Sequence, residues 1–348
     1  MKDIADIISD ILKDKRELRI CIVAHKNADP DAVASSLAVY YLVNNLCNKC
    51  KIVLCYPEGM ATNSLKIIEW YGKCMKVDIN KTSTSKCSEV NLGLDIVITV
   101  DTANPEQLGC FSDIMEHSRY VITIDHHKTG KLKSQSNLYV GGEEYSSTSE
   151  IMALILEAFL QRKSQDKRVP PCLATTLMSG IIYDSRRFLN IGSNTFRVME
   201  MLRVYGGNYF EALNLLEKEE DRSQRIAVLK ACQRMILKEI CGFIVVGTHI
   251  GSFESNVARI LVNSGADIAI VLSDKKDFTR IALRSRNDTV DVSAFALWLV
   301  RKLGTGSGGG HYNSALFEGV LKGFEKSRDK KVKKLLEFFG EYCIEQSS

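Results

Sequence analysis

The sequence contains no apolar run of the roughly 18 residues that a membrane-spanning helix needs. The apolar run at residues 151–160 is too short, and Glu157 interrupts it. The first four residues include an acid and lack the apolar core of a secretory signal. These absences predict a cytoplasmic protein with no membrane segment.

The sequence also lacks a strong excess of either charge, with 46 Lys and Arg against 42 Asp and Glu and a formal net charge of +4. A protein that grips long duplex nucleic acid by its phosphates normally has a concentrated basic stripe. The one dense basic segment here, residues 326–334, is typical of a solvated helix face. A small phosphorylated substrate therefore fits the charge better than a long duplex.

Several common site signatures are missing. No Gly-rich segment ends in the Gly-Lys-Ser/Thr of a P-loop, and no G-x-G-x-x-G turn follows the first strand pattern. Cys47 and Cys50 form a lone C-x-x-C without a second pair, so a zinc or redox site is the less favoured interpretation. In a cytoplasmic protein we expect the 11 cysteines to be reduced core thiols. Examples are Cys21, Cys55, Cys241 and Cys343.

What is present is a globular composition, 45% hydrophobic and 25% charged, in 348 residues, a length that suits two domains. Apolar strand patterns lie at residues 19–24, 51–55, 95–100 and 119–124. Helical patterns lie at residues 31–45, 63–71, 105–116 and 171–184. Continuous apolar strands separated by helices are typical of a parallel sheet covered on both faces. We therefore expect an α/β fold with an N-terminal parallel-sheet domain at residues 1–205.

A helical connector is expected at residues 206–238, followed by a smaller α/β domain at residues 239–348. In that domain a glycine-rich run at residues 304–310 precedes His311. Alone, such a run is typical of a flexible turn. Beside Arg284 and Arg286 it predicts an anion pocket, because glycine lets backbone amides approach a phosphate and arginine can grip it with two hydrogen bonds. An ordinary surface role remains the alternative for Arg286.

The strand pattern at residues 119–124 leads directly into an acid and two histidines. Neighbouring imidazoles beside a carboxylate form a poor core but a good metal site. Other elements end in similar residues: His25, Asp29 and Asp31 follow the first strand, Asp101 the third, Asp125, His126 and His127 the fourth, and Asp184 ends a later helix. Because ligands of open α/β sheets gather beyond the carboxyl ends of the strands, we expect these side chains in one cleft.

Carboxylates gathered in one cleft repel each other, by about 4 kcal/mol for two charges about 4 Å apart at an effective dielectric near 20. Protonation or bound cations relieve this repulsion, and carboxylates with a few imidazoles suit Mn²⁺ or Mg²⁺. Two such ions can hold an attacking hydroxide and stabilise the leaving oxygen of a phosphoester. For single residues the alternative role is helix capping. Asp29 or Asp31 could cap the helix expected at residues 31–45, and Asp101 could cap the helix expected at residues 105–116.

The motifs resemble those of the DHH family of phosphoesterases, in its RecJ-like and nano-RNase branch. Residues 25–31 are similar to the family's first motif, residues 100–102 to the second, residues 125–127 to the third and residues 180–185 to the fourth. In the C-terminal half, the residues that resemble the substrate-binding motif of the DHH-associated domain are Arg284, Ser285, Gly308, Gly309, Gly310 and His311. The resemblance therefore spans both expected domains.

The resemblance implies a catalytic DHH domain, a substrate-binding DHH-associated domain and an active site in the cleft between them. It implies that one metal is held by His25, Asp29, Asp101 and Asp184, and a second by Asp31, Asp101, His126 and Asp184. Asp101 would bridge the ions, and Asp125 would orient its neighbours without binding metal. His127 would face the substrate phosphate. Arg284 and His311 would bind the far end of a nucleotide.

Two segments depart from the family's motifs. Ser185, Arg186 and Arg187 stand where the family has Thr-Gly, and residues 311–315 replace its His-Lys-Asn-Ala-Ala. These departures concern the substrate rather than the metals. We predict that Arg186 or Arg187 adds a phosphate contact and that Tyr312 stacks on a base.

The activity implied by the resemblance is hydrolysis of short nucleotide phosphoesters, such as nano-RNA, dinucleotides like pApA or 3′-phosphoadenosine 5′-phosphate. The cofactors would be two divalent ions, Mn²⁺ first, with Mg²⁺ or Co²⁺ as alternatives. The competing functions are a RecJ-like single-strand exonuclease, an inorganic pyrophosphatase and a replication-associated scaffold protein that has lost its metals. The expected partners are short RNA or DNA oligonucleotides or dinucleotides as substrates. No binding to a membrane or to a long duplex is expected, and a homodimer is possible.

Overall fold

The computed structural model describes residues 7, 10–11, 17–47, 49–79, 83–90, 93–163, 168–217, 221–286, 290–321 and 323–347. The chain divides into two compact units, Met1–Lys218 and Glu219–Ser348, which we describe one at a time. The expected connector is divided between them. Helix α9 (Tyr209–Leu216) belongs to the first unit and α10 (Arg222–Arg234) to the second, while residues 218–220 lie outside the described residues.

The first unit is built on a six-stranded sheet in the order β3-β2-β1-β4-β5-β6. Its strands are β1 (Arg19–Val23), β2 (Lys51–Cys55), β3 (Ser83–Thr84), β4 (Ile96–Val100), β5 (Tyr120–Asp125) and β6 (Leu138–Gly141). Every neighbouring pair is parallel, which confirms the predicted parallel sheet. The sequence did not predict β3 and β6, which have only 2 and 4 residues.

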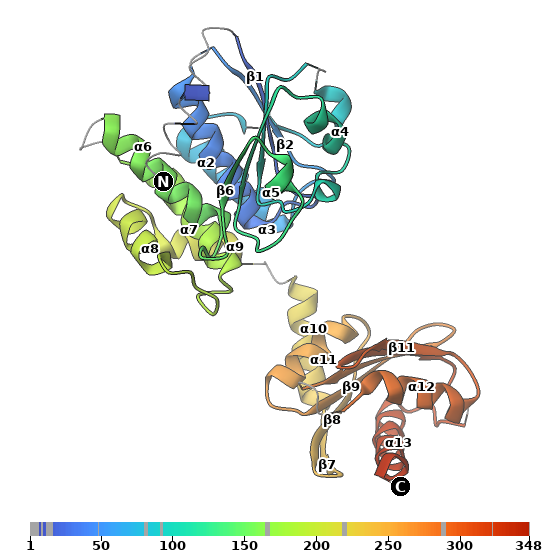
Figure 1. The fold of residues 1–348 in the computed structure, drawn as a ribbon. Coiled ribbons are helices and arrows are strands. Elements are labelled where there is room, and N and C mark those ends of the chain that lie inside the picture. Colours follow the sequence, from blue (N-terminus) through green and yellow to red (C-terminus); the bar gives the residue numbers. More distant parts are fainter. Residues whose placement is uncertain are drawn as a thin grey trace. The chain divides into compact units, whose positions relative to one another are not determined.

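Helices cover both faces of this sheet (Figure 1). One face carries α2 (Pro30–Leu46), α3 (Thr62–Met75), α6 (Thr148–Lys163), α7 (Pro171–Asp184), α8 (Thr195–Val204) and α9. The other carries η3 (Pro105–Leu108), α4 (Phe111–Glu116) and α5 (Leu132–Gln135). Alternate strand residues face each layer: Ile20 and Ile22 pack toward α2, and Cys21 and Val23 toward α4.

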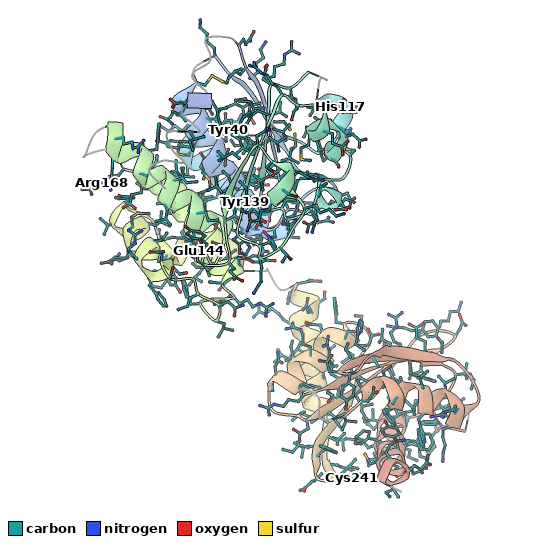
Figure 2. The ribbon with its side chains drawn as sticks, viewed as in Figure 1. Tyr40, His117, Tyr139, Glu144, Arg168 and Cys241 are labelled. Carbon is teal, nitrogen blue, oxygen red and sulfur yellow. A yellow bond between two sulfur atoms is a disulfide. The ribbon has the colours of Figure 1, made fainter. Side chains whose placement is uncertain are left out.

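The helix predicted at residues 105–116 is broken, because Gly109 has a φ of 57° and separates η3 from α4. His117, at the end of α4, precedes strand β5, whereas His126 and His127 follow it, and Nδ1 of His117 bonds to the backbone oxygen of Asp113 (Figure 2 labels His117). Its role is therefore local. Among the described residues, no helix has both the length and the hydropathy that crossing a membrane requires.

The second unit contains a mixed sheet in the order β11-β12-β10-β9-β8-β7. Its strands are β7 (Ile236–Ile240), β8 (Phe243–His249), β9 (Ile268–Asp274), β10 (Thr279–Ser285), β11 (Ser307–His311) and β12 (Ser314–Gly319). Only β8 and β9 run parallel. Helices α10 and α11 (Glu254–Asn263) pack on one face, and α12 (Val292–Leu303) and α13 (Arg328–Ser347) on the other.

Two expectations for this half were wrong. The polar helix does not continue through the expected connector to residue 238, because α10 ends at Arg234 and the chain enters β7 at Ile236. The glycine run is not a flexible turn, since Ser307–His311 forms edge strand β11 and pairs with β12. Both corrections come from tertiary pairing, which overrides local preference.

The cysteines are not all reduced, contrary to expectation. Three disulfides join Cys47 to Cys50, Cys74 to Cys172 and Cys87 to Cys110. The four cysteines named as examples are not part of these disulfides, although Cys241 is exposed rather than in the core (Figure 2). Disulfides are typical of oxidising compartments. The cytoplasmic location therefore stays a prediction.

The bond between Cys74 and Cys172 should matter for stability, because it joins α3 to α7 across 98 residues of sequence. Closing so long a loop restricts the unfolded chain, so Cys74→Ser should lower the free energy of unfolding by roughly 2–5 kcal/mol. Chemical denaturation under non-reducing conditions measures this loss. Cys232→Ser, at an exposed free cysteine, is the control. Equal stability of the two variants would contradict the prediction.

Candidate functional site

The first group of site residues lies where β1 leads into α2. Asp29 caps α2, because its Oδ1 accepts hydrogen bonds from the backbone nitrogens of Asp31 and Ala32 at 2.9 and 3.0 Å, and Pro30 begins the helix. The same Oδ1 lies 3.8 Å from Nε2 of His25. Capping and clustering are therefore not alternatives at Asp29, since one carboxylate does both.

Asp101 occupies the position directly after β4. Its backbone is left-handed, with φ 53°, a conformation that aspartate tolerates better than most residues. Its backbone nitrogen donates to the oxygen of Ile124 at 2.9 Å, and the side chain is buried. The alternative role as a helix cap was wrong: Asn104 and Gln107 form the capping box of η3.

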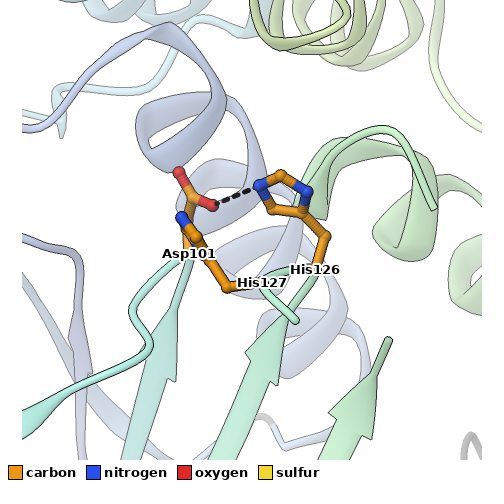
Figure 3. A group of neighbouring side chains, drawn as sticks. All are labelled: Asp101, His126 and His127. Atoms are coloured by element: carbon orange, nitrogen blue, oxygen red, sulfur yellow. Dashed lines mark ion pairs between the residues drawn. The ribbon is translucent and has the colours of Figure 1, made fainter. Parts of the chain in front are cut away.

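Asp101 links two histidines that come from different strand ends. Its Oδ2 lies 3.7 Å from Nε2 of His25, and its Oδ1 lies 3.5 Å from Nε2 of His126 (Figure 3). His126 also lies 2.9 Å from Oδ2 of Asp184, at the end of α7. The strand-end residues of the first unit are therefore brought together at the carboxyl edge of the sheet, as the sequence predicts.

Three groups of these side chains have ligand atoms within 4.8 Å of one another and can hold a metal ion. The groups are His25, Asp29 and Asp101; Asp31, His126 and Asp184; and Asp101, His126 and His127. Asp184 belongs to one group only, whereas the resemblance implied that it contacts both ions. All the donors are carboxylates and imidazoles, which suit a hard or borderline divalent ion.

Asp31 is held by a helix that the sequence did not connect to it. Its fully buried carboxylate accepts hydrogen bonds from the backbone nitrogens of Thr148 and Ser149 at 2.7 and 2.9 Å, in the first turn of α6. The positive end of the helix dipole favours a carboxylate there. Residues 147–150 have the Ser-x-x-Glu pattern of a capping box, but only half of it forms: the nitrogen of Glu150 donates to Ser147 Oγ at 3.1 Å, whereas Glu150 Oε2 accepts from the nitrogen of Ser146.

The electrostatics fit bound cations. Burial, with the Asp184 charge second, raises the pKa of Asp31 to about 7. Burial and then the charges of Asp31 and Asp29 raise the pKa of Asp101 well above its usual range. Burial alone would lower the pKa of His126, but the hydrogen bond to Asp184 and the Asp101 charge raise it to about 10. A divalent cation would relieve the repulsion among these carboxylates.

Asp125 and His127 form a separate pair beside the cluster. Nδ1 of His127 lies 2.6 Å from Oδ1 of the buried Asp125, and this hydrogen bond raises the pKa of His127. Tyr139 of β6 donates to the backbone oxygen of Asp125 at 3.2 Å (Figure 2). A Cβ on Gly141 would lie 1.7 Å from that oxygen, so β6 can approach Asp125 only with glycine there. Asp125 therefore fixes the orientation of His127.

A pocket of about 670 Å³ opens on the cluster. It is lined by His126, His127 and Asp184 of the cluster and also by Arg186, one of the two arginines expected to contact phosphate. Arg187 is not among its lining residues. Sequence reasoning missed the apolar residues of this pocket, Leu189 and Ile191.

In the second unit, Arg284 and His311 lie on one face of the sheet. Both pair in register with Ser314 of β12, and residues directly opposite on neighbouring strands share a face. A pocket of about 300 Å³ lies at Arg284 and Ser285, but the glycine run does not line it. Its other lining residues are Arg259, Val262, Asn263 and Arg286. Sequence reasoning missed Arg259 and Asn263, whose spacing of four on α11 places them on one face of that helix.

Comparison with known proteins agrees with this arrangement. The model of the DHH family, N-terminal domain, matches residues 19–181. An uncharacterized protein of Methanocaldococcus jannaschii is 30% identical over 343 residues, covering 97% of this chain and 98% of that protein. A probable manganese-dependent inorganic pyrophosphatase of Streptococcus equi subsp. zooepidemicus is 25% identical over 283 residues, covering 81% of this chain and 82% of that protein.

The crystal structure of an exopolyphosphatase-related protein from Bacteroides fragilis is similar over 98% of this chain and 97% of that one. Its TM-score is 0.57 at 17% sequence identity, so it shares the fold. The family match runs from β1 to residue 181 within α7, so it covers the acids and histidines at the strand ends but stops short of Asp184. On this match and on the relative from Methanocaldococcus, the chain belongs to the DHH family.

Proposed function

We propose that this protein is a divalent-metal-dependent phosphoesterase that hydrolyses short nucleotide phosphoesters, such as nano-RNA, pApA and 3′-phosphoadenosine 5′-phosphate. The observation that carries the proposal is the gathering of carboxylates and imidazoles from β1, β4, β5 and α7 at one edge of a parallel sheet. The relative described as a probable manganese-dependent inorganic pyrophosphatase supports metal-dependent phosphate chemistry and makes Mn²⁺ the first candidate.

His25, Asp29 and Asp101 would hold one ion, and Asp31, His126 and Asp184 the other. Two divalent ions, when bound, would activate a water and neutralise charge on the phosphate. Because Asp101 lies close to both His25 and His126, it is the residue through which both ions would be positioned.

His127 would act on the substrate directly. Asp125 occupies its Nδ1 and raises its pKa, which favours the imidazolium and leaves Nε2–H free to donate to a phosphate oxygen. Arg186 lines the same pocket and would add a second cationic contact. Both residues would hold the substrate phosphate against the metal ligands, so they would position the reacting group and stabilise its charge.

In the second unit, Arg284 and Ser285 would bind a phosphate group of the substrate, with Arg259 as a further contact. The exposed ring of Tyr312 would offer a base-stacking surface beside His311, and its backbone oxygen is anchored by the nitrogen of Val292 at 2.9 Å. The glycines Gly308, Gly309 and Gly310 keep β11 free of side chains next to His311.

Arg284→Ala should raise KM for a dinucleotide about 10- to 100-fold, because a charge-assisted hydrogen bond contributes about 1.5–3 kcal/mol. Steady-state kinetics with pApA measure this change. Arg280→Ala is the matched control on the same strand, because Arg280 is already paired with Glu318 at 2.6 Å. Equal KM values for the two variants would contradict the role of Arg284.

The proposed function is tested by turnover of a substrate panel with Mn²⁺: pApA, longer RNAs, DNA, 3′-phosphoadenosine 5′-phosphate and pyrophosphate. A nano-RNase turns over pApA fastest and slows with oligonucleotide length, whereas a RecJ-like exonuclease prefers longer single strands. The name of the Streptococcus relative favours inorganic pyrophosphatase as a second candidate, and pyrophosphate hydrolysis without nucleotide turnover would establish it. No turnover of any substrate would favour the non-catalytic scaffold.

A further inference from the structure

The pocket at the metal centre has both polar and apolar lining residues. The polar ones include the two histidines and Asp184 together with the cations Lys128 and Arg186. The larger apolar ones are Tyr145, Leu189 and Ile191. Leu189 is 82% exposed and Ile191 is 51% exposed, so two large aliphatic side chains face solvent in the pocket that contains the candidate metal ligands. We call these two residues the apolar lip.

The start of the loop that carries the lip is fixed by an unusual turn. Arg186, Arg187 and Phe188 are all left-handed, with φ values of 51°, 57° and 68°. Three such residues in a row without glycine are unfavourable and persist only where the surroundings enforce them. Here the nitrogen of Arg187 donates to Ile182 O at 2.8 Å, and that of Phe188 to Ser185 Oγ at 3.1 Å.

The middle of the loop and its far end are fixed as well. The nitrogen of Asn190, between the two lip residues, donates to Ser185 O at 2.9 Å. At the far end, the nitrogen of Gly192 donates to Thr195 Oγ1 at 2.9 Å, and this hydroxyl donates to the buried Glu150 Oε2 at 2.8 Å.

The next residue, Ser193, donates from its nitrogen to Glu144 O at 3.1 Å; Figure 2 labels Glu144 in this region. A Cβ on Gly192 would lie 2.3 Å from the same oxygen, so the loop packs closely against the segment before α6. The buried Glu150, which the proposed chemistry does not use, therefore holds the loop that displays the lip.

We propose that Leu189 and Ile191, with Tyr145, bind the nucleobase of a substrate whose phosphate lies at the metal centre. The inference rests on the proposed function and narrows its substrate class. Pyrophosphate or polyphosphate would gain nothing from two aliphatic side chains, whereas the apolar face of a base can cover them and remove them from water. In a flexible loop, Leu189 and Ile191 could fold back and pack against the loop's own backbone. This loop is fixed at both ends, so the two side chains stay exposed to a ligand in the pocket that Arg186 also lines.

The test compares binding of AMP and of inorganic phosphate to the whole protein with Mn²⁺, by calorimetry. Leu189→Ser combined with Ile191→Ser should lower the ratio of AMP affinity to phosphate affinity about tenfold, because the base loses its apolar contacts while the phosphate contacts stay. Val204→Ser is the matched control, since Val204 on α8 is 63% exposed and does not line the pocket. It should leave the ratio at the wild-type value.

The inference is overturned if the double variant keeps the wild-type ratio. It is also overturned if both affinities fall together, because the loop would then act by shaping the metal centre. A dimer that dissociates in the double variant, seen by light scattering, with an unchanged ratio would assign the lip to a second copy of the chain.

Failure of the proposed function is a separate result. If the wild type hydrolyses no nucleotide in the substrate panel but its AMP-to-phosphate ratio falls in the double variant, the base site stands and the catalytic proposal fails. If the wild type hydrolyses pApA and the ratio is insensitive to the lip, the catalytic proposal stands and the base site fails.

Discussion

Replacing Asp101 with asparagine is expected to lower kcat by at least about a thousandfold, a loss of roughly 4 kcal/mol of transition-state stabilisation. Asp101 lies 3.7 Å from His25 and 3.5 Å from His126, so it belongs to the group proposed for one ion and lies beside a proposed ligand of the other. Asparagine keeps the shape of the side chain but removes the charge that would bind the metals. The measurement is Mn²⁺-dependent hydrolysis of pApA at saturating substrate.

The same variant has a second readout that does not depend on activity. For the wild type, Mn²⁺ at 100 times its Kd should stabilise the protein by about 2.7 kcal/mol, or a rise in Tm of roughly 5–10 °C. Asp101→Asn should lose this rise. Without metal it should be at least as stable as the wild type, because burial and the charges of Asp31 and Asp29 disfavour ionised Asp101.

Asp113→Asn, at an exposed acid in the first turn of α4, is the control and should keep both the activity and the Mn²⁺ effect. A full Mn²⁺ effect in Asp101→Asn would show that Asp101 does not position the ions. If, with both proteins free of metal, Asp101→Asn had a lower Tm than the wild type, the carboxylate would have a structural role instead. That role would be to accept the hydrogen bond from Thr148 Oγ1 at 2.9 Å.

The strands that carry the site were predictable because each is a short apolar run buried on both faces. Lys51–Cys55 was predicted with its observed bounds, and the three other predicted strands of the first unit agree within one residue at either end. The edge strands β3 and β6 have no such run and exist only through pairing with their neighbours. In the second unit three of the five residues of β11 are glycine, which gives no strand pattern in the sequence, and only pairing with β12 makes this segment a strand.

The clustering of the candidate metal ligands was predictable for a related reason. Parallel strands end at one edge of the sheet, so residues that follow them meet there whatever their separation in sequence. The support for Asp31 was not predictable, because its hydrogen bonds come from α6, 117 and 118 positions away. The apolar lip was hidden for another reason: Leu189 and Ile191 look like ordinary loop residues until the left-handed turn at Arg186–Phe188 places them in the pocket.

Gly180→Ala is expected to disrupt the metal centre without replacing any of the proposed ligands. Gly180 lies in α7, where the added Cβ would be 2.1 Å from Ser149 Oγ and 2.8 Å from Asp31 Oδ1. Rotating the Ser149 hydroxyl does not clear the clash, because Ser149 Cβ would be only 2.9 Å away. Since Asp31 is fully buried and held by α6, either α7 moves away or the carboxylate leaves its place beside His126.

Overpacking of this kind costs about 1–3 kcal/mol, which should exceed the gain of about 1 kcal/mol that alanine brings to a helix. Gly180→Ala should therefore be less stable than the wild type and bind Mn²⁺ at least about tenfold more weakly, measured by calorimetry. Gly340→Ala is the matched control in α13, because its Cβ would meet only Ile240 Cγ2, at 3.5 Å, and the variant should be stabilised. If both glycine variants were stabilised and Mn²⁺ affinity were unchanged, α7 would not pack against Asp31 as closely as the metal centre requires.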